Sequence, residues 1–203
     1  MWRNINIIQK TIKIKGNNDN KLKIGGNDKL GFTMLLIIAA SGKFLKPILI
    51  TKGKTKRSLK KFDLNNEIIG TYSNNGWVNN GILKIALTLI HKITKGKKSV
   101  LLLDKYPAHK SDFITEIAKK LNINLVYVPV GKTSELQPLD ISINGILKEK
   151  AKKLWKQDRI NNPNKDITVK DGIKHFIKVK KDIKRKVIIN SFKKSCFNEK
   201  FVI

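Results

Sequence analysis

The spacing of hydrophobic and polar residues changes partway along the chain. The first part has strand-like patterns, and the later part has helical patterns alternating with strand-like ones. Residues 11–15 alternate apolar and polar side chains, which is typical of a half-exposed strand. The unbroken apolar run 32–40 predicts a central strand covered on both faces, and residues 47–51 predict its antiparallel neighbour. Between the first two strands, residues 16–31 are rich in Gly, Asn and Asp and indicate a turn or a loose hairpin. The first quarter of the chain is therefore expected to form a meander of strands.

After a basic loop at 52–61, the apolar residues return with a helical period. Those in residues 77–91 recur about every 3.6 residues, which predicts an amphipathic helix. Because β-α-β units are right-handed and pair their strands in parallel, the rest of the chain should add parallel strands and produce a mixed sheet with helices packed on it. The later elements are predicted, in chain order, as a strand at 99–103, a helix at 111–121 capped by Ser111, a strand at 124–128, a long basic helix at 137–155, and short helices at 168–178 and 182–195.

Length and composition indicate a single folded domain. The chain has 203 residues, 40% hydrophobic and 29% charged, which is enough for a substantial core and too few to expect two domains. We place the main domain over residues 1–158 and treat residues 159–203 as a basic helical extension of the same domain. The run 32–40 is far shorter than the roughly 20 residues that cross a bilayer, and the N-terminus lacks a signal-peptide layout, so we expect a soluble intracellular protein without membrane contact. The single cysteine, Cys196, excludes a disulfide within the chain and a cysteine zinc cluster.

Charge is the strongest bulk signal, with a formal net value of +28. Residues 1–62 carry +13 (15 basic, 2 acidic), residues 63–141 carry +3 (10 basic, 7 acidic) and residues 142–203 carry +12 (18 basic, 6 acidic). Such an excess repels itself unless it meets a polyanion, and nucleic acid is the commonest one. An alternative source of the charge is an AT-rich coding sequence, since Lys, Asn and Ile are all abundant. The residues that we expect to contact nucleic acid are Lys54, Lys56, Arg57, Lys110 and Lys132.

Two aspartates stand at the ends of predicted elements and are candidate metal ligands. Asp104 closes the apolar run 99–103, and Asp140 follows Pro138 at the start of the long helix, with 35 residues between the two. In open α/β sheets, sites gather at the carboxyl ends of the strands. Carboxylate oxygens suit Mg²⁺ or Mn²⁺, and a pair of such ions can activate a water or a 3′-hydroxyl and stabilise the leaving oxygen of a phosphodiester. From spacing alone, the more common role of such an aspartate is a turn residue or a helix cap.

The residues around these aspartates favour the role of metal ligand over that of a turn residue or helix cap. The chain reads VLLLDKYPAHK at 100–110, LVYVP at 125–129 and TSELQPLDISIN at 133–144. Two further segments, ASGKFLKPILITKG at 40–53 and NSFKKSCF at 190–197, extend the likeness over nearly the whole chain. Together these segments resemble the pogo/Tigger branch of the DDE transposases, to which domesticated proteins such as centromere protein B belong.

The resemblance implies an RNase H-like fold of the α/β class, in which helices flank a mixed central sheet and three carboxylates hold two Mg²⁺ or Mn²⁺ ions. It also implies an ancestor that cut DNA at element ends and joined the 3′-hydroxyl to a target. By position, Asp104 matches the second acid and Asp140 the third. His109 matches the histidine of the family's PAH segment, near the scissile phosphate, with a helix-start residue bonded to backbone as the alternative. Gln137 and Pro138 are expected to shape the turn that presents the third acid.

The chain departs from the family at the first acid and beside the second. In relatives the first acid ends the first strand, and counting back from Thr11 places it at or just before Met1. Residues 1–10 contain no carboxylate, so we expect an N-terminally truncated domain that lacks the first strand and the first acid. Lys105 stands where the family usually has Asn, and its ammonium could pair with Asp104 and weaken the hold of that carboxylate on a metal.

Three functions remain as alternatives. The first is a nucleic-acid-binding domain derived from a DDE transposase, ancestrally capable of metal-dependent DNA cleavage and strand transfer but incomplete or inactive with two acids. The second is a domesticated, non-catalytic module that binds DNA or self-associates as a homo-oligomer. The third, an unrelated RNA-binding protein, would need stacking aromatics on exposed strands, whereas Trp77 and Trp155 are expected in the core. We expect DNA as the partner and the nucleus as the location.

Overall fold

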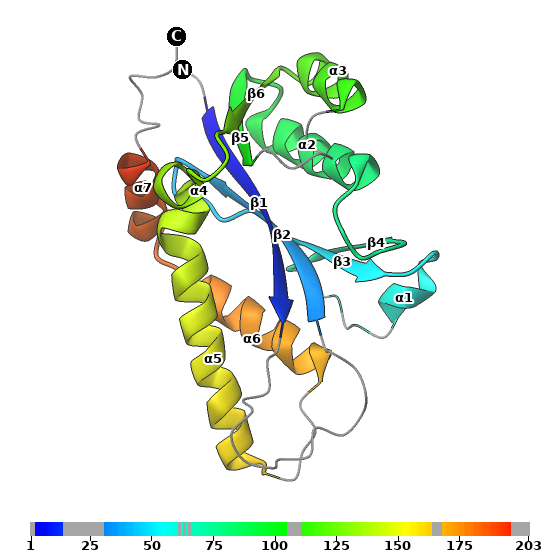
Figure 1. Cartoon of the computed structure of the whole chain (residues 1–203), viewed down its shortest axis with the longest axis vertical. Coiled ribbons are helices and arrows are strands. Elements are labelled where there is room, and N and C mark those ends of the chain that lie inside the picture. Colours follow the sequence, from blue (N-terminus) through cyan, green and yellow to red (C-terminus); the bar gives the residue numbers. More distant parts are fainter. Residues whose placement is uncertain are drawn as a thin grey trace.

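Helices cover both faces of one twisted, six-stranded sheet (Figure 1). The predicted turn at 16–31 lies outside the described part of the chain, apart from its last residue. The computed structural model describes residues 3–13, 31–60, 62, 64, 66–104, 111–163 and 168–195.

The strands form a mixed sheet in the order β4-β3-β2-β1-β5-β6. β2 runs antiparallel to both β1 and β3, as the predicted meander requires. β3 pairs with β4, β1 with β5, and β5 with β6 in parallel. This mixed sheet flanked by helices confirms the predicted α/β class and the RNase H-like arrangement. The strands are β1 (Arg3–Lys13), β2 (Gly31–Ala39), β3 (Ile48–Lys52), β4 (Ile69–Ser73), β5 (Ser99–Asp104) and β6 (Ile123–Val128).

β1 takes the central place between β2 and β5, and it is longer than the predicted strand at 11–15. Its backbone register places Arg3 opposite Ser99 and Asn6 opposite Leu102. The strand reads RNINIIQKTIK and contains neither Asp nor Glu. That the domain lacks the family's first strand and first acid stays a prediction.

The sequence pattern did not predict β4, because a glycine stands in it. The segment reads IGTYS, and only its last residue is fully buried. A Cβ at Gly70 would collide with Leu64 and come close to Leu59. The strand therefore depends on contacts with residues outside it, which a local hydrophobic pattern cannot reveal.

The helices predicted at 77–91 and 111–121 correspond to α2 and α3. Ser111 caps α3 as predicted, since its Oγ accepts the Ile114 N–H at 3.3 Å. The long helix predicted at 137–155 is present with other bounds: it begins just after Pro138 as a π-helical turn at Leu139–Ile143 and continues as an α-helix at Asn144–Asn161. Proline suits the start of a helix because it has no backbone N–H to donate. Among the described residues, no helix is both long and apolar enough to cross a bilayer. The helices are α1 (Arg57–Lys60), α2 (Asn80–Thr94), α3 (Asp112–Lys120), α4 (Thr133–Leu136), the π-helical turn η2 (Leu139–Ile143), α5 (Asn144–Asn161), α6 (Val169–Lys181) and α7 (Arg185–Lys194).

A separate hydrophobic core lies on each face of the sheet, and β5 contributes to both. Leu101 and Leu103 belong to the first core, where α2 and α3 pack. Leu102 belongs to the second core, where η2, α5, α6 and α7 pack. Successive side chains of a strand point to opposite faces, which explains why an unbroken apolar run was needed.

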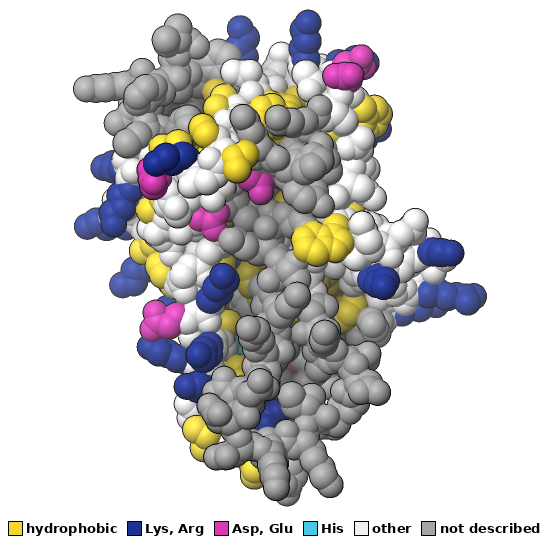
Figure 2. Space-filling view, in the orientation of Figure 1, with side chains coloured by type: hydrophobic (Ala, Val, Ile, Leu, Met, Phe, Trp, Pro, Cys, Tyr) yellow, Lys and Arg dark blue, Asp and Glu magenta, His cyan; other side chains and the backbone are white. Residues whose placement is uncertain are grey.

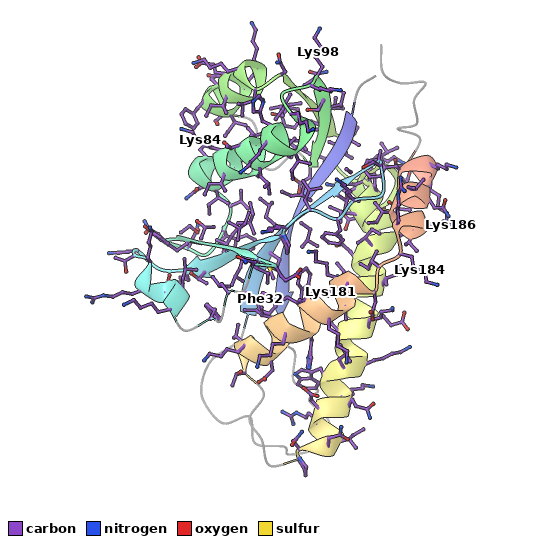
Figure 3. All side chains as sticks on the ribbon, turned by 180° about the vertical axis from the view of Figure 1, so that it is seen from behind. Phe32, Lys84, Lys98, Lys181, Lys184 and Lys186 are labelled. Carbon is purple, nitrogen blue, oxygen red and sulfur yellow. The ribbon has the colours of Figure 1, made fainter. Side chains whose placement is uncertain are left out.

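The C-terminal helices belong to the second core. α5 continues through residue 159, where the basic extension was predicted to begin, and Phe176 of α6 and Phe192 of α7 are buried in the second core. Arg185 at the start of α7 donates its Nε–H to the Ser41 carbonyl at 2.9 Å, which ties the last helix to the turn after β2. The outer side of these two helices is basic and exposed (Figure 3), as shown by Lys181, Lys184 and Lys186.

Neither tryptophan predicted in the core lies inside it. Trp77 is 43% exposed, although the next residue, Val78, is buried, so the prediction for this residue is wrong. Trp155 is half-buried, and the Arg159 guanidinium lies 4.9 Å from the centre of its ring in a cation–π contact. Trp155 therefore lies beside the second core, next to Leu154.

Candidate active site

Asp104 is the last residue of β5 and lies at the carboxyl edge of the sheet. Its backbone pairs with Val128, the last residue of the parallel strand β6. Because side chains alternate along a strand, Asp104 projects to the same face as Leu102, the face covered by η2 and α5. Its side chain is half-buried, with Oδ1 fully buried. The sheet therefore directs this carboxylate toward the segment that carries Asp140.

Asp140 lies in η2, a π-helical turn that joins α4 to α5. The carbonyl of Gln137 accepts the N–H groups of both Asp140 and Ile141, at 2.9 and 3.0 Å. Leu139 and Ile143, on either side of the carboxylate, are fully buried in the second core with Leu102. Two buried neighbours fix the turn and leave Asp140 half-buried at its surface. Single π-helical turns of this kind often occur at functional sites.

Asn144 holds the Asp140 carboxylate in place. Its Nδ2–H donates to Asp140 Oδ1 at 2.8 Å, and the Asn144 residue is only 5% exposed. An amide donor to a charged oxygen restricts the rotation of the carboxylate and occupies one of its acceptor positions. The sequence contains this residue in the motif LQPLDISIN, but its role was missed. The available signal was its spacing of four residues, which brings two side chains together on a helix.

Gln137 was predicted near the site, and its place in the fold agrees with a positioning role. The residue is 1% exposed and lies where α4 ends, just before Pro138. Its backbone supports the turn that presents Asp140, as described above. The three other residues predicted beside the acids or in contact with nucleic acid, Lys105, His109 and Lys110, lie outside the described part of the chain.

The remaining basic residues predicted to contact nucleic acid divide into two places. Lys132 lies between β6 and α4, and its Nζ forms an exposed ion pair with Glu135 at 2.9 Å. Lys54 and Lys56 lie between β3 and α1, Arg57 is the first residue of α1, and all three are exposed. Because β3 and β5 are separated by β2 and β1, these three residues belong to another part of the edge. Figure 2 shows Lys and Arg side chains gathered at several such places on the surface.

Two carboxylates fit part of the metal centre that the family resemblance implies. Asp104 and Asp140 offer oxygen donors on one face, which is the chemistry that Mg²⁺ or Mn²⁺ prefers. Within the described ranges, no group of three or more His, Cys, Asp or Glu residues comes together as a metal site. The described donors therefore fit one hard divalent ion that completes its shell with waters or phosphate oxygens, and they do not fit a three-carboxylate centre with two ions.

Comparison with known proteins agrees with the motifs around both acids. A family model described as DDE superfamily endonuclease matches residues 29–192. The proteins named "Pogo transposable element with KRAB domain" from Mus musculus and Homo sapiens are each 27% identical to this chain over 137 residues, covering 66% of it. The chain spans 22% of the length of these curated relatives.

A solved structure of similar outline is "Mos1 transposase paired-end complex with left transposon end". It has a TM-score of 0.48 and 12% sequence identity, and the match covers 93% of this chain and 55% of that one. The region matched by the family model runs from residue 29, before β2, to residue 192 in α7. It includes both acid motifs and every strand of the sheet except β1. The chain belongs to the DDE superfamily endonuclease family, and its relatives place it with the pogo-like members.

Proposed function

We propose that this chain is a DNA-binding domain derived from a DDE transposase, in which the apparatus for DNA cleavage is incomplete. The observation that carries the proposal is the pair Asp104 and Asp140 on one face of the sheet, together with the absence of any cluster of three metal-binding side chains among the residues that the structure describes. The central strand β1 also lacks an acid. With two carboxylates, the site can hold less positive charge beside a phosphate than the three-acid centre of the family.

The chemistry of the acids follows from their surroundings. A bound Mg²⁺ or Mn²⁺ would supply a Lewis acid for a phosphate oxygen. Asp104 and Asp140 would hold the ion, and Asn144 orients the second of these carboxylates through its 2.8 Å hydrogen bond. Such an arrangement supports attachment of one phosphate. The in-line displacement used by two-metal nucleases also requires a second ion at the leaving oxygen.

DNA binding is supported by charge rather than by the acids. The net charge of +28 and the exposed basic residues of the β3–α1 segment provide sequence-independent attraction to phosphates. Contacts of this kind release counterions, so the affinity falls linearly with salt on a logarithmic plot. Binding should therefore persist when the acids are removed.

A fluorescence anisotropy titration of the whole chain with duplex DNA at several salt concentrations tests this proposal. We expect tight binding at low salt, a steep loss of affinity as salt rises, and affinities within about twofold for Asp104→Ala, Asp140→Ala and the unaltered chain. Asp182→Ala, which removes an exposed carboxylate that pairs with Lys150 at 3.7 Å, is the matched control. A chain that binds no DNA at low salt would contradict the proposal.

The second candidate is a domesticated module that self-associates. The relatives named above are described as a pogo transposable element with a KRAB domain, which favours the domestication in this candidate. Sedimentation velocity with and without DNA distinguishes the two: a stable homo-oligomer without DNA favours self-association, whereas a monomer that binds DNA favours the first proposal. We also place the protein in the nucleus, which imaging of the tagged chain in cells would test.

A further inference from the structure

Trp77 is an exposed aromatic residue whose backbone is held in place by hydrogen bonds. The residue is 43% exposed, while Val78 beside it is 4% exposed and belongs to the first core. Its backbone N–H donates to Asn75 Oδ1 at 2.9 Å, and its carbonyl accepts the Ser73 hydroxyl at 2.7 Å. The two hydrogen bonds fix the turn between β4 and α2, so the indole is presented from a rigid base.

The turn that carries Trp77 is joined to the end of β3. Ser73 pairs with Lys52 in the parallel register of β3 and β4, and the Gly53 N–H donates to the Ser73 carbonyl at 2.9 Å. Gly76 has a φ of +77°, and a Cβ there would lie 3.4 Å from the Lys52 backbone nitrogen. A glycine is therefore favoured by this left-handed backbone conformation, and a Cβ there would only be in ordinary contact with Lys52.

The segment that leaves β3 at this point is basic and exposed. Its charged side chains form no ion pair with any carboxylate in the described part of the chain, so their charge is available to an anionic partner. The cations, all exposed, are Lys52, Lys54, Lys56, Arg57 and Lys60.

We propose that Trp77 and this basic segment form a binding surface for an unpaired nucleotide of DNA, with the base stacked on the indole and the phosphates on the lysines. The inference rests on the proposed DNA binding. It adds where on the protein the DNA binds and that the bound DNA contains an unpaired nucleotide. Aromatic rings next to basic grooves bind single strands because every base has a face that can stack. The exposed positive charges favour a nucleic acid over an uncharged protein as the partner. The exposed indole favours an unpaired base, because the face of a base stacked within a duplex is not accessible to it.

The surface lies apart from the two acids. β1, β3, β4, β5 and β6 all run in the same direction, so Trp77 and Asp104 stand on the same carboxyl edge of the sheet. β4 is four strands away from β5 in that order, or roughly 19 Å at 4.8 Å between neighbouring strands. An unpaired base on Trp77 would therefore be held several nucleotides away from a phosphate at Asp104.

The test compares a single-stranded oligonucleotide with a blunt duplex of the same number of phosphates, bound by the full chain. Stacking is worth about 1–3 kcal/mol per base, so Trp77→Ala should weaken single-strand binding roughly 5- to 150-fold and change duplex binding by less than about twofold. Trp77→Phe should retain most of the single-strand affinity. Phe113→Ala, which removes another exposed aromatic residue (49% exposed, on α3), is the control and should change neither affinity.

Two further measurements accompany the titrations. Thermal unfolding shows whether each variant is folded, and quenching of tryptophan fluorescence by oligo(dT) reports stacking on an indole. The proposal expects quenching that is largely lost in Trp77→Ala while its unfolding temperature stays close to that of the unaltered chain. Equal losses for single strand and duplex, or no loss for either, would overturn the stacking surface and leave DNA binding intact. If the unaltered chain binds neither DNA, the proposed function fails, and this inference fails with it.

Discussion

The two ends of the carboxyl edge of the sheet differ in how they hold their polar groups. At the β5 end, Asp104 and Asp140 are half-buried, and Asp140 is fixed by Asn144 and by buried neighbours. At the β3–β4 end, the basic side chains and Trp77 are exposed, and two hydrogen bonds hold the backbone of the turn that carries Trp77. Reactive groups need a fixed orientation, whereas phosphate contacts tolerate mobile side chains. A chain that lost one acid could therefore lose cleavage and keep its hold on DNA.

The largest effect should come from the core beneath the acids. Leu139 is fully buried one residue before Asp140, and Leu139→Ala should lower the free energy of unfolding by about 2–5 kcal/mol. Chemical denaturation measures the change. Ile141→Ala, on the half-buried side of the same turn, is the control and should cost clearly less. Equal losses of unfolding free energy for the two variants would mean that burial of Leu139 in the second core does not stabilise the turn.

Removing charge from the β3–α1 segment should act on DNA binding and leave stability unchanged. For the triple change of Lys54, Lys56 and Arg57 to Gln, we expect the slope of log affinity against log salt to fall by about 2.7, at roughly 0.9 per phosphate contact. The matched control changes the exposed α5 residues Lys148, Lys152 and Lys156 to Gln. An equal fall in the slope for the α5 triple would assign DNA binding to general charge and not to this end of the sheet.

Asn144 tests how firmly the second acid is held. Asn144→Ala removes a hydrogen bond to a charged oxygen and should destabilise the fold by about 1.5 kcal/mol. A double-mutant cycle with Asp140→Ala isolates the pair, and the two changes should be non-additive by a similar amount. Additive effects would show that the 2.8 Å contact contributes nothing to stability.

The smallest effect concerns the ion pair between Glu67, just before β4, and Lys181 at the end of α6. The hydrogen bond from Lys181, and then its positive charge, hold the pKa of Glu67 below its ordinary value. A lowered folded-state pKa stabilises the fold above the unfolded pKa, and this contribution is lost as the pH falls through the folded value. Glu67→Gln should therefore reduce stability slightly at pH 7 and make no difference at pH 2. Unfolding curves at both pH values give the difference.

The sequence predicted the sheet well because its strands have local signatures. The unbroken apolar run that ends at Asp104 required burial on both faces, and the structure confirms two cores. β4 could not be predicted in the same way, since Gly70 makes room for Leu64 and Leu59, and that contact is invisible in a local pattern.

For the candidate site, the sequence indicated the acids and the turn at Gln137 but not the side chain that holds Asp140. Asp104 and Asp140 were identified from the motifs around them, whereas Asn144 acts through a side-chain contact that appears only once the π-helical turn is known. Trp77 was predicted in the core as a large aromatic residue, although it precedes the helical apolar pattern that begins at Val78. Val78 is buried as that pattern requires, whereas Trp77 is 43% exposed.

The central claim is that DNA binding persists where cleavage does not, and a plasmid-nicking assay tests it most directly. Supercoiled plasmid is incubated with the whole chain and Mg²⁺ or Mn²⁺ at a salt concentration where binding is saturated. We predict that the plasmid is bound and stays supercoiled, to the same extent for the unaltered chain, Asp104→Ala and Asp140→Ala. Metal-dependent nicking by the unaltered chain that both substitutions abolish would contradict the claim.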